Sequence, residues 1–253
     1  MGRKGAKNHL KRLPAPAFWP IHRKEFQWVV RPRSGAHELN RCLPLLLVVR
    51  DILQLAKTRK EAKFLLSEGN VVVNGRVRRD DDYPVGLMDV IAFPLLDKAY
   101  RVIPAPRRGL ILHSITGEER EYKLCQIVNK TSVKGGHLQL NLNDGRNLLL
   151  KVADPGNPVE DLYETHGTLK IQIPTAEITD YLNLTEGVLA VITSGKNIGR
   201  WGEVVEIDEV EGTHSPTITL KGEGDDQYKT IIDYVFPIGK GMPWISMPED
   251  ETS

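Results

Sequence analysis

The chain has 253 residues, which is more than one typical domain, so we expect two or three compact units. Hydrophobic residues make up 40% of the chain and aromatic residues only 6%, which favours small cores of Val, Leu and Ile. The sequence shows no apolar run of the roughly eighteen residues that a membrane helix needs, no apolar signal core after its basic start, and no cysteine spacing typical of zinc or disulfides. We therefore expect a soluble, cytoplasmic protein without metal, cofactor or membrane.

The formal net charge of +1 hides a strong asymmetry along the chain. Residues 1–41 contain ten Lys or Arg against two Asp or Glu, residues 42–108 twelve against eight, and residues 109–253 twelve against twenty-three. The net charges of the three segments are thus +8, +4 and −11. This distribution is typical of a chain that places one end against phosphates.

Residues 1–42 are predicted to form an extended basic arm, because they are rich in Pro, Gly and basic residues and lack sustained periodicity. A free tail of this charge would be disordered, so it needs an acidic partner to order it. Its aromatic residues could stack on bases or could pin the arm to the protein's own core; they are Phe18, Trp19, Phe26 and Trp28. The basic residues expected to bind RNA are Arg3, Lys4, Lys7, Lys11, Arg12, Arg23, Lys24, Arg31 and Arg33.

Two helices are predicted next. Apolar residues recur at helical spacing after Pro44, which predicts a first helix; they are Leu45, Val48, Val49, Ile52, Leu53 and Ala56. The run Thr58-Arg59-Lys60-Glu61 matches a capping box, so a second helix should run from Arg59 to about Glu68 and end at Gly69. Arg59, Lys60 and Lys63 would lie near its positive end, where free backbone amides favour a phosphate.

A hairpin should follow, because valines flank Asn74-Gly75, a strong turn signal. Its second strand would direct Arg76 and Arg78 away from a face packed by Val71, Val73 and Val77. The run Asp80-Asp81-Asp82 could suggest a metal site, but consecutive acids cannot all converge on one ion, which favours a solvated loop.

The motifs of residues 43–92, taken together, resemble the small RNA-binding module named after bacterial small-subunit ribosomal protein four. They are the capping box with Ala62, the Gly69-Asn70 break, the run from Val71 to Arg76, and the closing run from Pro84 to Ile91. We call residues 43–98 the S-four-type module. In that family the first turn of the second helix and the hairpin grip structured RNA. Carried over by position, the resemblance implicates Thr58, Arg59, Lys60, Lys63, Asn70, Asn74, Arg76 and Arg78.

Residues 99–173 are predicted to form a central, barrel-like β domain. Leucines alternate on both sides of Asp144-Gly145, which indicates a hairpin with one buried face. Further short strands are expected at 109–116, 122–128 and 169–173. The histidines of this region are isolated from each other and from cysteine, so they indicate no ligand set.

Residues 174–240 are predicted to form a small barrel, and residues 241–253 an acidic tail. The segment from Gly187 to Val205 alternates, passes through a Gly-rich basic turn and resumes as a strand. It resembles the KOW motif of SH3-like barrels in ribosomal proteins and elongation factors, in which the loop approaches the RNA backbone. The resemblance implicates Lys196, Asn197 and Arg200; alternatively the loop merely shapes the barrel.

Enzymatic motifs are missing from the sequence. Gly195-Lys196 lacks the earlier glycine and the following hydroxyl of a phosphate loop, and no nucleophile motif such as Gly-x-Ser-x-Gly occurs. Modifying enzymes that carry an S-four-type module have large catalytic domains, whereas residues 99–253 divide into two small β units. We therefore expect no catalytic residue and no small-molecule substrate.

The order of arm, module, β domain and KOW barrel resembles the archaeal and eukaryotic small-subunit ribosomal protein family called "S four e". The runs Gly2-Arg3-Lys4-Gly5 and His9-Leu10-Lys11-Arg12 and the segment from Arg31 to His37 fit this family. Ala36 departs from the Pro that the family usually has at this position, which affects the stiffness of the arm rather than family membership. The resemblance implies an α+β, mostly β fold and a non-catalytic constituent of the cytoplasmic small ribosomal subunit, with small-subunit rRNA and neighbouring ribosomal proteins as partners. A free RNA-binding regulator that uses the barrel is the alternative. Deleting residues 1–41 should lower both RNA affinity and its salt dependence.

Overall fold

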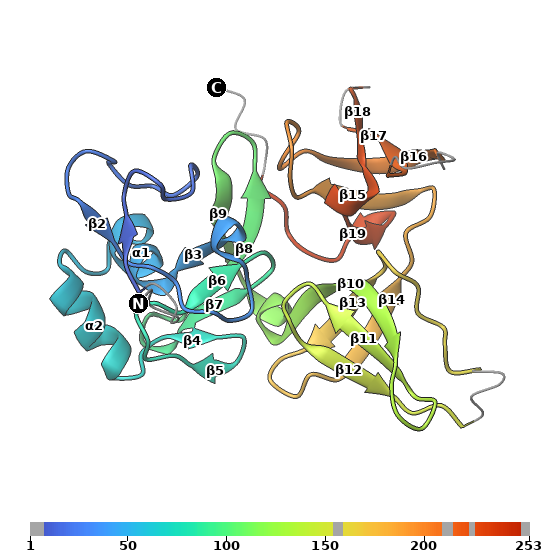
Figure 1. Cartoon of the computed structure of the whole chain (residues 1–253), viewed down its shortest axis with the longest axis horizontal. Coiled ribbons are helices and arrows are strands. Elements are labelled where there is room, and N and C mark those ends of the chain that lie inside the picture. Colours follow the sequence, from blue (N-terminus) through green and yellow to red (C-terminus); the bar gives the residue numbers. More distant parts are fainter. Residues whose placement is uncertain (1–7, 154–158, 209–214, 223–225, 249–253) are drawn as a thin grey trace, which may run out of the picture.

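The structure is a computed structural model that describes residues 8–153, 159–208, 215–222 and 226–248. It consists mainly of antiparallel strands with two short α-helices, which confirms the predicted α+β, mostly β class. Figure 1 shows the N-terminal segment and the helices on one side of the molecule and two further sheets on the other. Three sheets of five, five and six strands form the framework, within the described residues.

Residues 8–41 are folded onto the protein by their own apolar side chains, which corrects the expectation of an extended arm that only an acidic partner would order. Strands β1 (Leu10–Lys11) and β2 (Trp28–Val29) form a short ribbon, and a 3-10 turn (Leu39–Arg41) follows. Leu10 and Trp19 are buried in the core of the S-four-type module, and the Trp19 indole nitrogen donates to the carbonyl of Cys42 over 2.8 Å. The apolar side chains of this segment thus find burial within the chain itself.

The first predicted helix is shorter than expected. Residues Cys42–Pro44 form strand β3, which pairs with β6 (Pro84–Gly86), so the backbone before Leu45 is extended. Only α1 (Leu45–Leu47) is α-helical, and a π-helical turn (Val48–Ile52) continues it. The predicted apolar side chains still face the core, because the π-helical turn continues the helical path of the backbone after α1.

The second helix, α2 (Arg59–Ser67), has the predicted capping box. The Thr58 hydroxyl accepts from the backbone N–H of Glu61 over 3.2 Å, and the Glu61 carboxylate accepts from the N–H groups of Thr58 and Lys57. Gly69 ends the helix with φ of +82°, a conformation that glycine adopts without strain. Ala62 and Leu66 are buried against the core.

The first sheet has the order β5-β4-β7-β8-β9. Its strands are β4 (Val72–Val73), β5 (Arg76–Val77), β7 (Val90–Phe93), β8 (Lys98–Ala105) and β9 (Gly109–Ile115). Asn74 and Gly75 both have positive φ, as the predicted tight turn between β4 and β5 requires. The long hairpin of β8 and β9 continues this sheet, although the sequence boundary at residue 99 assigns it to the central domain.

The second sheet has the order β12-β11-β10-β13-β14. Its strands are β10 (Tyr122–Ser132), β11 (Leu138–Leu142), β12 (Asn147–Leu150), β13 (Thr168–Gln172) and β14 (Ile178–Leu182). The hairpin at Asp144-Gly145 is confirmed, and Cys125, Leu140 and Ile171 lie in the core. Strand β14 belongs to this sheet, beyond the predicted boundary at 173.

The third sheet has the order β18-β17-β16-β15-β19-β20. Its strands are β15 (Val188–Ile192), β16 (Trp201–Asp208), β17 (Thr217–Lys221), β18 (Gln227–Ile231), β19 (Val235–Lys240) and β20 (Met242–Pro243). Strands β15 and β16 form the predicted hairpin around the glycine-rich turn. Further 3-10 turns in the described part of the chain cover Pro94–Leu96, Gly117–Glu121 and Ile232–Tyr234.

One core joins the three sheets. Ile103 from β8, Leu124 from β10 and Phe236 from β19 are fully buried in the same cluster. Ile245, in the segment predicted as an acidic tail, is also buried there, so this segment is anchored as far as residue 248. The acidic run Glu249-Asp250-Glu251 lies outside the described residues. The sheets are therefore held at fixed positions relative to one another.

Candidate nucleic-acid interface

The start of α2 presents three basic side chains to solvent. Arg59, Lys60 and Lys63 are exposed, on the first turns of a helix whose free N–H groups form the positive end of its dipole. The capping hydrogen bonds from Lys57 and Thr58 hold the pKa of Glu61 below its ordinary value, so this carboxylate stays charged within the cap. The predicted cluster is therefore present as one exposed basic surface.

The acidic run 80–82 lies against these cations. Asp81 accepts from the Arg59 guanidinium over 2.9 Å and lies 3.5 Å from the Lys63 ammonium, while Asp82 accepts from Arg33 over 2.7 Å. No group of three or more His, Cys, Asp or Glu that could hold a metal ion occurs in the described part of the chain. The run is not simply solvated, because it pairs with basic residues of the predicted interface.

The hairpin of β4 and β5 carries two further cations. Arg76 is exposed, and the Arg78 guanidinium lies 4.4 Å from the centroid of the Tyr83 ring, which fixes its plane. Val77 is 48% exposed, so it does not pack with the other valines as the sequence pattern predicts. Asn70 is partly exposed and donates to Glu68. The second strand of the hairpin thus faces solvent on both sides.

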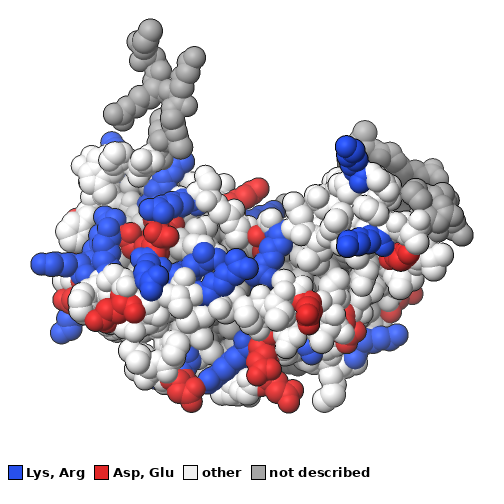
Figure 2. All heavy atoms as spheres, turned by 90° about the horizontal axis from the view of Figure 1, so that it is seen from below, with Lys and Arg blue, Asp and Glu red and all other residues white. Residues whose placement is uncertain are grey.

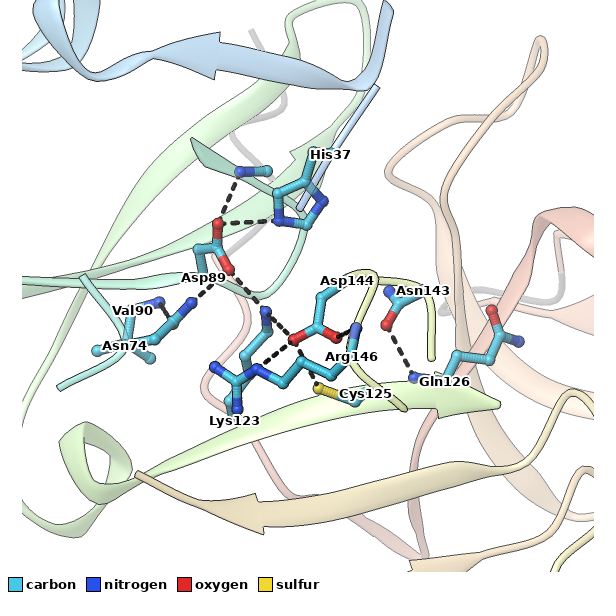
Figure 3. A network of polar contacts seen from close by, with 11 residues as sticks. His37, Asn74, Asp89, Val90, Lys123, Cys125, Gln126, Asn143, Asp144 and Arg146 are labelled. Atoms are coloured by element: carbon cyan, nitrogen blue, oxygen red, sulfur yellow. Dashed lines mark hydrogen bonds and ion pairs between the residues drawn. The ribbon is translucent and has the colours of Figure 1, made fainter. Parts of the chain in front are cut away.

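Asn74 departs from the prediction, because its side chain points into the protein. It is 8% exposed; its amide nitrogen donates to Asp89 over 2.8 Å and its amide oxygen accepts from the N–H of Val90 over 3.0 Å (Figure 3). With both ends of the amide engaged, this side chain supports the hairpin turn from within. We therefore remove it from the set of RNA contacts.

Asp89 belongs to a buried charge network that joins the first two sheets (Figure 3). The Lys123 ammonium donates to Asp89 over 2.7 Å and to Asp144 over 2.9 Å, and all three side chains are almost completely buried. His37 lies 2.9 Å from the other Asp89 oxygen, and Arg146 lies 3.1 Å from Asp144. The network therefore links the N-terminal segment, the module hairpin and strand β10.

The two acids of this network are held ionised. Burial alone would raise the pKa of Asp89, but the Lys123 charge and the hydrogen bonds from His37 and Asn74 outweigh it and lower that pKa. Burial likewise opposes the charge on Lys123, whose pKa is nevertheless raised by the two carboxylates. Burial raises the pKa of the Cys125 thiol to about 12 and that of Cys42 to about 12, so neither is a nucleophile at neutral pH. These groups serve structure rather than catalysis.

The basic residues of the N-terminal segment divide into two groups. Arg12 is 7% exposed and donates to the carbonyl of His22, and Arg23 donates to the carbonyls of Leu13 and Ala15, so these two side chains hold the segment together. Because these internal hydrogen bonds engage both side chains, we leave Arg12 and Arg23 out of the RNA contacts proposed below. Lys11, Lys24 and Arg33 are exposed and Arg31 is partly exposed, whereas Arg3, Lys4 and Lys7 lie outside the described residues.

The glycine-rich loop between β15 and β16 lies apart from α2, at the turn between β8 and β9. Gly199 is packed against the backbone of Ala105 and Pro106 so closely that a side chain there would meet it at 2.4 Å. Lys196 is exposed, Asn197 is partly exposed, and Arg200 lies 5.7 Å from the Tyr228 ring centroid. The KOW assignment remains a prediction.

Two basic residues beside this loop escaped the sequence analysis. Arg107 and Arg108 are exposed in the turn between β8 and β9, where Arg107 has φ of +62°. The sequence signal is the pair of adjacent arginines in a turn bounded by Pro and Gly, but only the packing of Gly199 against Ala105 and Pro106 brings this turn to the glycine-rich loop. The two arginines and Lys196 therefore lie on segments that pack against each other.

The basic residues are unevenly distributed over the surface. Figure 2 shows Lys and Arg side chains gathered mainly over the half of the molecule that contains α2 and the first sheet, with Asp and Glu between them. Within the described residues no helix combines the length and apolar character that crossing a bilayer requires. The geometry thus offers a rigid, basic surface suited to phosphates.

Comparison with known proteins gives consistent results along the chain. The model described as Ribosomal family S4e matches residues 96–178, the RS4NT (NUC023) domain matches residues 4–40, and the S4 domain matches residues 45–91. The small ribosomal subunit protein eS4 of Staphylothermus marinus is 53% identical over 98% of this chain and 99% of that protein. The protein of the same name from Methanocaldococcus jannaschii is 46% identical over 98% and 100%.

A solved structure is similar as well. The crystal structure of the 30S ribosomal protein S4e from Thermoplasma acidophilum superposes with a TM-score of 0.66 at 28% identity, covering 81% of this chain and 99% of that one. The likeness includes most of the described framework, so fold and sequence point to the same relatives.

Proposed function

The chain belongs to the ribosomal protein S4e family, a family of structural ribosomal proteins rather than enzymes, and on that premise we propose that it is a constituent of the small ribosomal subunit that binds folded small-subunit rRNA. Neighbouring small-subunit proteins would be its other partners, and the assembled subunit in the cytoplasm its location. No catalytic step is part of the proposal. The observation that carries it is the exposed basic surface of α2 and the β4–β5 hairpin within an S-four-type module.

The RNA contacts that we propose come from three places. The module contributes its helix start and hairpin, the N-terminal segment contributes its exposed cations, and the β15–β16 loop contributes a separate contact. The proposed residues are Arg3, Lys4, Lys7, Lys11, Lys24, Arg31, Arg33, Thr58, Arg59, Lys60, Lys63, Asn70, Arg76, Arg78, Lys196, Asn197 and Arg200. Electrostatic contacts of this kind release counterions from RNA, so binding should weaken steeply with salt.

The test is the salt dependence of binding to small-subunit rRNA fragments. Lys60→Ala and Arg76→Ala should each lower the slope of log affinity against log salt by about 0.7–0.9, the value for one lost phosphate contact. Lys134→Ala is the matched control, because Lys134 is an exposed lysine of the central domain outside the proposed surface. Equal slopes for the wild-type protein, the two test variants and the control variant would contradict the proposed surface.

Two deletions at the N-terminus should have different effects, because only the longer one removes residues of the core. Deleting residues 1–41 would remove Leu10 and Trp19 from the core and so damage folding as well as binding. Deleting residues 1–7 removes three cations and leaves that packing in place, and it should lower the slope by about two to three. Cosedimentation with salt-washed small subunits separates a constituent, which stays bound, from a free factor, which washes off.

A further inference from the structure

The β1–β2 ribbon has one inward and one outward face. Leu10 is paired with Val29, and Lys11 with Trp28. Because paired residues point to the same side of an antiparallel ribbon and neighbours along a strand point to opposite sides, Leu10 and Val29 pack on the core while Lys11 and Trp28 face outward. Phe26 precedes Trp28 by two residues and is also exposed. Trp28 on the outward face and Phe26, which lies just outside the strand, are thus two exposed aromatic side chains close together in the chain.

The exposure of these rings is unusual for the segment that bears them. Trp28 is 51% exposed and Phe26 is 63% exposed, whereas Trp19 of the same segment is 4% exposed and hydrogen-bonded. Large apolar side chains left in water close together in the chain mark a contact surface more often than a lone exposed residue does. The segment thus buries Trp19 in the core and leaves Trp28 and Phe26 exposed to solvent.

Basic side chains lie beside both exposed rings. The Lys11 ammonium lies 5.8 Å from the Trp28 ring centroid, the His9 ring lies 5.5 Å from it at an interplanar angle of 59°, and the Arg12 guanidinium lies 5.0 Å from the Phe26 ring centroid. Residues 1–41 carry a net charge of +8. Aromatic rings beside basic side chains suit a ligand that combines flat rings with negative charge, whereas a purely apolar partner would offer the Lys11 ammonium no counter-charge.

The ribbon is held in this shape before any ligand arrives. The Arg12 guanidinium donates to the His22 carbonyl over 2.6 Å and to the Glu25 carboxylate over 3.2 Å, and the Arg12 N–H donates to the Gln27 carbonyl. These bonds tie the end of the first strand to the connecting loop and to the residue before the second strand. Binding therefore requires little ordering of the backbone.

We propose that the outward face of the β1–β2 ribbon binds unpaired nucleotides of RNA, with bases stacked on Trp28 and Phe26 and the neighbouring phosphates near Lys11 and His9. This inference rests on the proposed function and adds a ligand class to it. The start of α2 fits phosphates of a folded helix, whose stacked bases are out of reach, whereas the ribbon fits bases that have left the stack. Figure 1 places β1 and β2 on the side of the molecule away from the third sheet, so they extend the module's end of the surface.

The experiment compares two RNA probes on the full chain at moderate salt: a single-stranded oligouridylate of about ten nucleotides, and a blunt RNA duplex with the same number of phosphates. The double variant Trp28→Ala with Phe26→Ala should lower affinity for the single strand about tenfold or more and leave duplex affinity within about twofold. Trp28→Phe should recover part of the loss. Leu13→Ala is the matched control, since Leu13 is a 66% exposed apolar residue of the same segment.

The outcomes separate this inference from the proposed function. Unchanged affinity of the double variant for both probes, in a protein whose duplex binding still depends on Lys60 and Arg76, would overturn the stacking surface alone and assign the ribbon to a protein partner. An equal loss of affinity for both probes would overturn the stacking surface as well, because a blunt duplex has no unpaired bases and losing the two rings should not weaken its binding. Failure of the wild-type chain to bind either probe would overturn both proposals.

Discussion

Charged side chains occur in two contrasting settings in this molecule. Around Lys123 they are buried and fully engaged with each other, whereas at the start of α2 they face water and have one carboxylate within reach. A buried ion that loses its partner pays a large desolvation penalty, while an exposed pair contributes only about 0–1 kcal/mol. The first set is therefore committed to the fold, and the second set can exchange its carboxylate for a phosphate.

The sharpest test of this difference uses two lysines of strand β10. Lys123→Met should lower the free energy of unfolding by about 3–5 kcal/mol, because it leaves Asp89 and Asp144 buried without their shared cation. Lys130→Met, which removes a partly exposed pair with Asp161, should cost about 0–1 kcal/mol. Chemical denaturation of both variants measures the two costs. Similar costs would mean that burial does not distinguish the two settings.

Acid should affect the buried network next. The pKa of Asp89 is lowered in the folded protein, so its contribution to stability is complete above the unfolded value of about 4 and is lost as the pH falls through the folded value. The pKa of Asp144 is lowered too and acts in the same direction. Unfolding free energy measured from pH 7 downward should thus decline below about pH 4. Asp89→Asn should make this decline shallower, and an unchanged decline would exclude Asp89 as a source.

Local signals allowed much of this architecture to be predicted. The capping box at Thr58 and the tight turns at Asn74-Gly75 and Asp144-Gly145 depend on neighbouring residues, and all three are present. The buried charge network around Lys123 could not be predicted, because Lys123 is 34 positions from Asp89 and no short sequence motif indicates that the two side chains are in contact. For the same reason the sequence could not show that Asn74 turns inward. Pairing of β10 with β13 likewise joins strands that lie far apart in the sequence.

The cap of α2 lies between the two settings, since it is exposed but makes a defined hydrogen bond. Thr58→Ala should lower unfolding free energy by about 1 kcal/mol, the usual cost of a lost N-cap. Thr58→Ser keeps the hydroxyl and should retain most of that stability. Thermal and denaturant unfolding of the two variants decide the matter: if serine is as destabilising as alanine, the threonine methyl rather than the cap hydrogen bond is responsible.

The smallest expected effect concerns the carboxylate that faces Arg59 and Lys63. Asp81→Asn keeps the backbone carbonyl that accepts from Leu46 but removes the negative charge, so both cations become available to phosphate. RNA affinity at low salt should rise about two- to fivefold, and the gain should shrink as salt screens the same charges. The control is Asp97→Asn, because Asp97 forms an exposed pair with Arg120 away from the proposed surface and asparagine tolerates its left-handed backbone.

The sign of the Asp81 effect decides what that carboxylate does. A rise in affinity means that it competes with phosphate for cations that the fold leaves exchangeable, which is the behaviour expected of the exposed setting. A fall in affinity would mean that Asp81 holds Arg59 and Lys63 in their binding positions, as Asp89 and Asp144 hold Lys123. In that case the start of α2 would be a preorganised part of the fold, and the contrast between the two settings would be one of burial alone.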